Sequence, residues 1–361
     1  MELADQKMYE RIDKFNRMAM NADIIPLPVG LYEGKMGLCI YFYELAGLTS
    51  ERKYRRAANK IFLDIANRIT DRIEIDPPGG LTGICMAINC LTDSGYMEGN
   101  PDHVLKSYDD KIIQSLLFNF QLDFSPDLDR IRMVLGSLAY LTTRLQSTGL
   151  PGNEREIMQG VIIELINKAE SLAIDRFTEP SSFSVTAYFT PFYLQLLKHI
   201  YQLNFYNCKI EKIIDGISPH ILGIYPLNKG NRLSLSSAMN ELNATIGGIP
   251  EWDRHIELLQ QGLDNHQIIR EFRNKDITFN RGLCGFYYLL RKTGVNREYN
   301  DLFIDRIANS DFWDHLFKND NPYIQPFSLY SGAPGVILTY LHMLTRSNTV
   351  MFFDKAIGQY V

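Results

Sequence analysis

Apolar residues recur at helical spacing along most of the chain. In Tyr54–Asn67, the side chains of Ala57, Ile61 and Ile65 fall on one face of a helix. The same period is found in Val161–Ala173 and Ile256–Leu263, whereas the alternating pattern of strands is nearly absent. We therefore predict an all-α protein in which Gly and Pro residues separate the helices.

A short glycine pattern repeats along this helical background. Four Gly-x-x-Gly sequences each precede an apolar segment, and they are Gly34–Gly37, Gly80–Gly83, Gly282–Gly285 and Gly332–Gly335. The first two begin 46 residues apart and the last two begin 50 apart, and the gap of 202 residues between Gly80 and Gly282 leaves room for three more units. Weaker copies with other small residues fill that gap at Met133–Gly136, Ser184–Ala187 and Leu235–Ala238.

A period of about 50 residues is typical of helical repeat proteins. We predict one α/α toroid domain over residues 1–361, with seven helical hairpins that start near residues 30, 79, 130, 181, 232, 279 and 329. The apolar helices that follow the glycines would form an inner ring, and charged helices such as Arg52–Arg68 would form an outer one. Glycine lets the preceding loop approach closely, and free N–H groups at each helix start would face a cavity lined by these loops.

Composition narrows the class of protein. The net charge of −5 argues against a nucleic-acid or anionic-membrane partner, and 45% hydrophobic residues are enough for a large core. The five cysteines are an odd number and widely spread, which indicates reduced thiols. The sequence shows neither a secretory signal nor an apolar run long enough to span a membrane, so we expect a cytoplasmic protein.

The set of repeats resembles the lanthionine synthetase C-like (LanC-like) family. The most similar stretches are Gly30–Leu45, Gly79–Leu91 and Ser328–Leu341. The resemblance implies a double-layered α/α toroid. It also implies a zinc enzyme that adds a peptide Cys thiolate to a dehydrated Ser or Thr and closes a thioether ring.

The metal-binding side chains that the resemblance implies are missing here. A Cys-His pair is expected before the first glycine of the sixth unit, where this chain has Asn280 and Arg281. Leu233 stands where a Cys of the fifth unit is expected, and Phe183-Ser184 where a His of the fourth is expected. Zinc prefers thiolate and imidazole ligands, so we predict no metal site and no cofactor. Without zinc, a substrate thiol would keep its pKa near 8.5 and stay largely neutral.

Four of the five cysteines are predicted to be core residues. Cys39 and Cys85 follow the second glycine of their units and Cys284 lies between two glycines, so all three would face the packed interior. Cys90 lies five residues after Cys85 on the same apolar stretch. A zinc site built around Cys284 and a histidine stays open as an alternative.

Residues just before each glycine pair are the candidates for ligand binding. The six that we single out as the rim of the cavity are Tyr32, Glu33, Asn280, Arg281, Tyr330 and Ser331, and Pro78, Gly79, Leu233 and Ser234 share their register. Arg281 and Glu33 would pair, either to recognise a peptide terminus or to join the first and last units. Tyr32 and Tyr330 suit a peptide-binding cavity and suit loop packing equally.

Three functions follow from these observations. The first is a zinc-free LanC-like protein that binds a peptide substrate or a partner enzyme in a peptide-modification pathway. The second is a zinc-dependent cyclase that forms lanthionine rings, with relocated ligands. The third is another α/α toroid enzyme, such as a glycoside-processing one, which needs two nearby carboxylates; Glu33 and Glu241 are the candidates.

Overall fold

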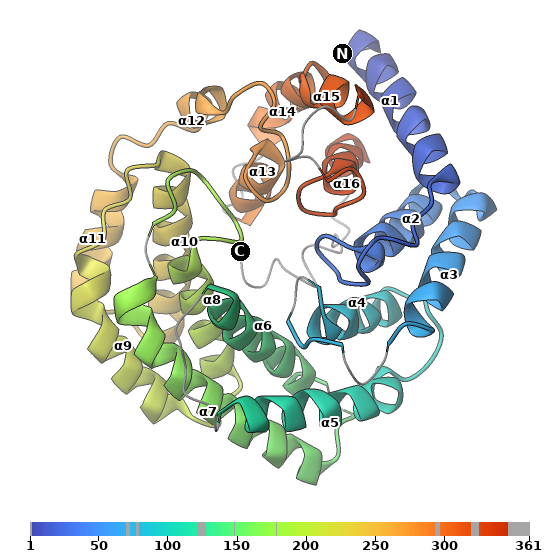
Figure 1. Ribbon diagram of the computed structural model, residues 1–361. Helices are drawn as coiled ribbons and strands as arrows, with labels where there is room; N and C mark the ends of the chain where they lie inside the picture. Colours follow the sequence, from blue (N-terminus) through green and yellow to red (C-terminus); the bar gives the residue numbers. More distant parts are fainter. Residues whose placement is uncertain are drawn as a thin grey trace. The chain divides into compact units, whose positions relative to one another are not determined.

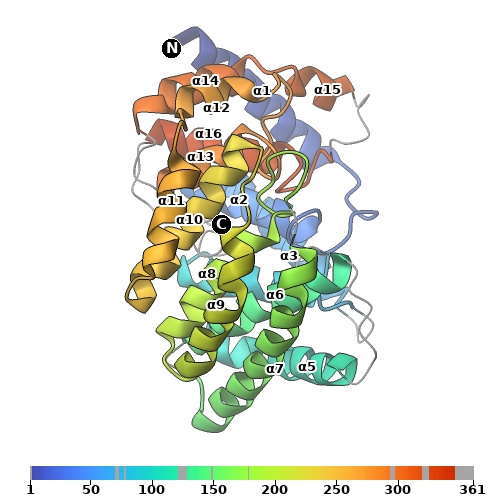
Figure 2. The ribbon, with the colours of Figure 1, turned by 90° about the vertical axis from the view of Figure 1, so that its left-hand side faces the viewer.

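The protein is built of helices joined by loops, as Figures 1 and 2 show. The computed structural model describes residues 2–69, 73–76, 79–120, 128–147, 149–177, 179–292, 297–318 and 325–345. Its α-helices are α1 Glu2–Asn21, α2 Lys35–Thr49, α3 Arg52–Ala66, α4 Leu81–Asp93, α5 Pro101–Phe120, α6 Leu128–Leu145, α7 Gly152–Arg176, α8 Phe189–Gln202, α9 Asn207–Leu222, α10 Lys229–Ile246, α11 Pro250–Gln260, α12 Asn265–Glu271, α13 Leu283–Lys292, α14 Asn300–Ala308, α15 Phe312–Lys318 and α16 Ala333–Thr345. One 3-10 helix, η1, spans Arg297–Tyr299. The described residues contain no strand, as the sequence predicts.

Two compact units make up the chain. The first contains residues 1–73, 183–185 and 264–358, with helices α1–α3 and α12–α16. The second contains residues 74–182 and 186–263, with helices α4–α11. In the first unit α2 packs on α3 and α16, and α14 packs on α1, α13 and α16. In the second unit α4 packs on α5, α6 on α7 and α8, and α10 on α8 and α11. That the whole chain forms one domain stays a prediction.

The helices that follow the glycines are buried, and the helices after them are amphipathic. On α2, Lys35–Tyr43 and Leu45 are all buried. On α3, only Tyr54, Ala58, Ile61 and Ile65 are buried, at the spacing of one helical stripe. The predicted stripe is therefore corrected at one position, because Ala57 is half-buried and Ala58 takes its place. The charges of Glu51–Arg56 are exposed to solvent, as expected.

Each glycine pair lets the preceding loop fold back onto the start of its helix. The first helical N–H donates to the carbonyl seven residues earlier in four units, from Lys35 to Pro28, Leu81 to Glu74, Leu283 to Asp276 and Ala333 to Pro326, at 2.7–3.2 Å. A Cβ atom on Gly282 would lie 2.5 Å from the Asp276 oxygen and 2.6 Å from the Thr278 nitrogen. The glycines are thus required by a close backbone approach.

Where the glycine pair is lacking, the loop becomes helix instead. α6 begins at Leu128 and α10 at Lys229, so the predicted repeat motifs Met133–Gly136 and Leu235–Ala238 lie inside these helices. The prediction that they open their helices is wrong, because a chain that does not fold back can continue its helical hydrogen bonds. Leu233 and Ser234, expected on a loop, are consequently helical residues of α10. The fourth motif, Ser184–Ala187, does precede its helix, α8.

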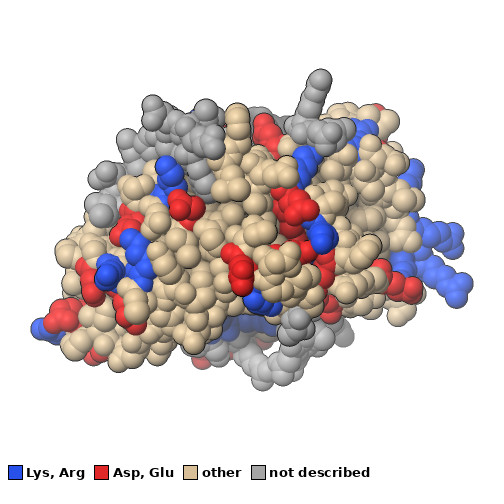
Figure 3. All heavy atoms as spheres, turned by 90° about the horizontal axis from the view of Figure 1, so that it is seen from below, with Lys and Arg blue, Asp and Glu red and all other residues tan. Residues whose placement is uncertain are grey.

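The surface carries charges of both signs. On the face shown in Figure 3, basic and acidic side chains are interspersed over much of the described part. This mixture agrees with the small net charge of −5. Among the described helices, none is both long enough and apolar enough to cross a lipid bilayer.

The fold-back contact predicts different effects for two glycine substitutions. Gly282→Ala should lower the free energy of unfolding by about 1–3 kcal/mol, because the new methyl group overlaps backbone atoms. Gly160→Ala, within α7, is the matched control: nothing lies within 4 Å of its Cβ position. That substitution should stabilise the protein by about 0.4–1 kcal/mol. Urea unfolding of both variants measures the difference, and equal effects would contradict the close approach.

Candidate functional site

Four loops in the first compact unit are joined by backbone hydrogen bonds. We call them the four-loop platform, and they are residues 30–34, 183–185, 279–282 and 328–332. The N–H of Leu329 donates to the carbonyl of Tyr32 (2.9 Å), and the N–H of Asn280 donates to the carbonyl of Tyr330 (3.0 Å). The N–H of Val185 donates to the carbonyl of Asn280 (2.9 Å). Three predicted site residues, Tyr32, Asn280 and Tyr330, therefore meet in one place.

Tyr32 and Tyr330 stack on each other inside the platform. Their ring centroids lie 4.1 Å apart with an interplanar angle of 11°. The Phe279 ring lies against the other side of the cluster, 5.3 Å from Tyr330. Tyr330 is buried, and burial raises the pKa of its hydroxyl well above the ordinary value, with a further increase from Tyr32. Both rings pack between loops, and Tyr32 is the one that keeps partial exposure.

The side chains of Asn280 and Ser184 contact each other. The Ser184 hydroxyl donates to the Asn280 side-chain oxygen at 3.1 Å, and Ser184 is buried. Ser328 makes a similar bridge, because its hydroxyl donates to the Tyr32 carbonyl at 2.9 Å. Neutral hydrogen bonds therefore fill the platform where these loops meet.

Glu33 and Arg281 lie on the platform loops but do not pair. Both side chains are exposed, and among the described residues neither forms an ion pair. The predicted bridge between them is absent from the structure because each points into water, where a surface pair gains little. Ser331 is half-buried and its N–H donates to the Ser328 hydroxyl at 2.9 Å. Glu33 and Arg281 thus present one charge of each sign on the platform loops.

The helix starts next to the platform are not open to a ligand, contrary to the sequence-based expectation. The first N–H group of α13 is occupied by the Asp276 carbonyl, and that of α16 by the Pro326 carbonyl. The N–H groups of Lys35 and Met36 on α2 likewise donate to the loop between Pro28 and Gly30. The fold-back that the glycines permit uses the donors that an anion would need. Of the other predicted positions, Gly79 belongs to the second unit, and Pro78 lies outside the described residues.

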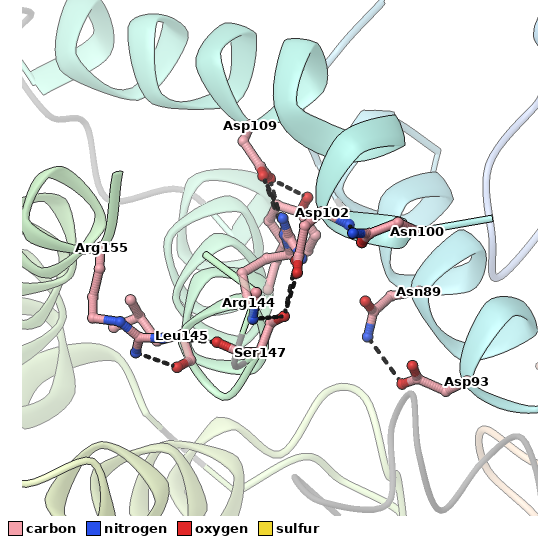
Figure 4. A network of polar contacts seen from close by, with 11 residues as sticks. Asn89, Asp93, Asn100, Asp102, Asp109, Arg144, Leu145, Ser147 and Arg155 are labelled. Carbon is pink, nitrogen blue, oxygen red and sulfur yellow. Dashed lines mark hydrogen bonds and ion pairs between the residues drawn. The ribbon is translucent and has the colours of Figure 1, made fainter. Parts of the chain in front are cut away.

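A buried ionic network in the second compact unit was not predicted. Figure 4 shows Arg144 of α6 between two carboxylates of α5. Its guanidinium contacts Asp102 at 2.7 Å and Asp109 at 2.9 Å, and the side chain of Arg144 is fully buried. Tyr140 donates a hydrogen bond to Asp109, and Ser147 donates one to Asp102 (2.8 Å). Burial is the larger effect on Asp109 and raises its pKa, although the hydrogen bonds from Arg144 oppose it.

This network links α6 to the helices on either side of it in the sequence, α5 and α7. Arg155 of α7 extends it, donating to the carbonyls of Leu145 and Ser147 at 2.7 Å each. The sequence held one signal, since Tyr140 and Arg144 are four residues apart on an otherwise apolar helix face. All five polar partners are engaged with one another, so the network supports the fold and offers no open group for a ligand.

The comparisons with known proteins agree with this architecture. Residues 25–186 match the family model described as "Lanthionine synthetase C-like protein". Among solved structures, "Nisin cyclase" matches with a TM-score of 0.61 and 13% sequence identity, over 99% of this chain and 98% of that one. Over residues 25–186 the chain is similar to the LanC-like family. Its fold is that of nisin cyclase, so the predicted α/α toroid is confirmed. No curated protein is detectably similar to it in sequence.

The residues at these positions of the chain do not fit zinc. The positions at which the resemblance implies ligands hold an amide, a guanidinium, an aliphatic side chain and a hydroxyl. Among the described residues, no group of three or more His, Cys, Asp and Glu side chains is arranged to hold a metal. Ser184 and Asn280, which stand at two of these positions, are hydrogen-bonded to each other. A neutral hydroxyl and a neutral amide are poor ligands for zinc. The family match itself ends at residue 186, before the fifth and sixth units.

Four of the five cysteines are confirmed as core residues. Cys39, Cys85, Cys90 and Cys284 are buried, and Cys208 is exposed. Burial raises the pKa of the Cys39, Cys85 and Cys284 thiols far above the ordinary value. These thiols stay protonated at neutral pH, whereas a zinc ligand or a nucleophile needs the thiolate.

Thiol reactivity tests this burial. With iodoacetamide at pH 8, only Cys208 of the native protein should be alkylated, because the other four thiols are buried and inaccessible to the reagent. In guanidinium chloride all five should react. Peptide mass spectrometry identifies the labelled residues. Rapid labelling of native Cys284 would show an exposed or ionised thiol and contradict the packing of α13.

Substitution of Arg144 tests the buried network. Arg144→Met leaves Asp109 and Asp102 without their cation and should lower the free energy of unfolding by about 3–5 kcal/mol. Arg132→Met on the same helix is the control, since its pair with Asp129 is exposed and should contribute less than about 1 kcal/mol. Denaturant unfolding measures both values. Equal losses would show that the network adds nothing beyond a surface pair.

Proposed function

We propose that this LanC-like protein binds a peptide, or a partner enzyme of a peptide-modification pathway, and does not form thioether rings with zinc. The chemistry of the platform carries the proposal. Asn280 and Arg281 stand where a Cys-His pair is implied, and the Asn280 side chain is hydrogen-bonded to Ser184. An amide and a guanidinium cannot lower the pKa of a substrate thiol as a zinc ion does.

The platform has features that suit binding. Tyr32 offers a flat, partly exposed ring held by stacking on Tyr330. Glu33 and Arg281 are exposed on the platform loops with no ion pair among the described residues, so each is open to a partner of opposite charge. A rigid aromatic ring flanked by charges is a common means of holding a peptide. This arrangement supports a binding surface that needs no metal.

The two alternative functions have weaker support. A zinc-dependent cyclase needs ligands that the described residues do not assemble. For a glycoside-processing enzyme the second candidate carboxylate, Glu241, is held by Lys198 at 2.5 Å. A carboxylate held in this way is less suited to protonate or attack a sugar.

Metal content of the purified protein decides between binding and zinc catalysis. Protein prepared without chelator or nickel resin should contain well under one zinc ion per chain, and should still do so after incubation with zinc chloride and dialysis. A peptide with one cysteine and one dehydroalanine should then keep its alkylatable thiol in the presence of protein and zinc. About one tightly bound zinc ion per chain, with loss of the peptide thiol, would overturn the proposal.

A further inference from the structure

A buried arginine in the second compact unit has no negative partner in the part of the chain that the structure describes. Arg232 lies in the first turn of α10 and is only 8% exposed. Among the described residues no carboxylate forms an ion pair with it, and its Nε atom is buried without a hydrogen bond. A buried cation without a counter-charge is costly, and the positive end of a helix dipole increases the cost. Such an arrangement points to an anion that is bound from outside the chain.

The surroundings of Arg232 restrict the choice of that anion. Its guanidinium lies 5.1 Å from the centroid of the Tyr225 ring and donates a hydrogen bond to the Tyr225 hydroxyl. The ring and the hydroxyl of Tyr225 contact the guanidinium, but neither is a carboxylate that would neutralise its charge. Tyr225 is 47% exposed and Leu227, two residues on, is 91% exposed. The Tyr225 ring against Arg232 is therefore open to solvent, and an exposed leucine follows it in the same loop.

The carboxylate of Glu179 already accepts hydrogen bonds from other groups. Glu179 accepts hydrogen bonds from the N–H groups of Leu227 (2.9 Å) and Asn228 (3.0 Å). The Asn231 side chain donates to it as well, at 3.2 Å. These contacts fix the loop before α10 and leave Glu179 directed at backbone donors. They fix the backbone of Leu227 and Asn228, and among the described residues Glu179 forms no ion pair with Arg232.

We propose that Arg232 binds a carboxylate of the peptide ligand, with Leu227 in contact with an adjacent apolar side chain of that ligand. The inference rests on the proposed peptide-binding function and names the chemistry that recognises the peptide. Arginine suits this role, because its planar fork of N–H groups matches the two oxygens of a carboxylate. Because the Nε atom is buried, the Nη atoms at the end of the guanidinium are the donors to this carboxylate.

Binding of small carboxylates tests the proposal. N-acetyl-leucine carries a terminal carboxylate beside an apolar side chain, and N-acetyl-leucine amide differs only in lacking the charge. N-acetyl-aspartate amide places the carboxylate on a side chain, so it distinguishes an acidic residue from a peptide C-terminus. Isothermal titration and ligand-observed NMR should detect at least one of the two carboxylates and not the amide.

Variants then assign the binding to Arg232. Arg232→Met should weaken carboxylate binding by about tenfold or more, and Arg232→Lys should weaken it less. Arg132→Met removes an exposed charge elsewhere and should bind as the wild type does. The urea midpoint of Arg232→Met should equal or exceed that of the wild type, because a buried cation without a counter-charge does not stabilise the fold.

Three results would overturn the proposal. They are binding of the amide as tightly as the acid, carboxylate binding that survives Arg232→Met, and absence of carboxylate binding by the wild type. A lowered urea midpoint of Arg232→Met would instead assign the arginine a structural role. Zinc content, measured on the same preparation, tests the proposed function separately. A zinc-loaded protein that still binds carboxylates through Arg232 would overturn the zinc-free function and leave this site intact.

Discussion

The contact between a loop carbonyl and a glycine at a helix start is the constraint on which the fold depends. It places the loop against the first turn of the helix, with no room for a Cβ atom at Gly34, Gly80, Gly282 or Gly332. The loop carbonyls then accept the first helical N–H groups, so the buried helix ends are satisfied without side-chain caps at Gly34 and Gly80. Packing of apolar helices and placement of the loops both follow from this local geometry.

The same constraint explains the chemistry of the platform. Loops that fold back are brought close enough for Tyr32, Asn280 and Tyr330 to be linked through their main chains. The side chains of these loops are then fixed in position with little freedom to lose. Two of them stack, one hydrogen-bonds to Ser184, and the charged Glu33 and Arg281 are left facing solvent.

The sequence predicted those features that depend on local pattern. Helical periodicity and the glycine repeat were sufficient for the all-α fold, the buried helices after the glycines and the burial of Cys39, Cys85 and Cys284. It did not predict the early starts of α6 and α10. The residues before Met133 and Leu235 can form either a loop or a helix, and the two conformations differ little in backbone energy. Nor did it predict the ion pairs of Arg144 or the isolation of Arg232, since both depend on which residues meet across helices far apart in the chain.

Several of the hydrogen bonds that join the platform loops run between main-chain atoms. Any residue other than proline supplies the same N–H and carbonyl groups, so these main-chain links do not depend on which side chains stand at residues 32, 280 and 330. The stacked rings and the hydrogen bonds of the Ser184 and Ser328 hydroxyls add side-chain contacts to these links. The scaffold can exchange a metal ligand for an amide, or one recognition group for another, without the cost in stability that follows when a structural metal is removed.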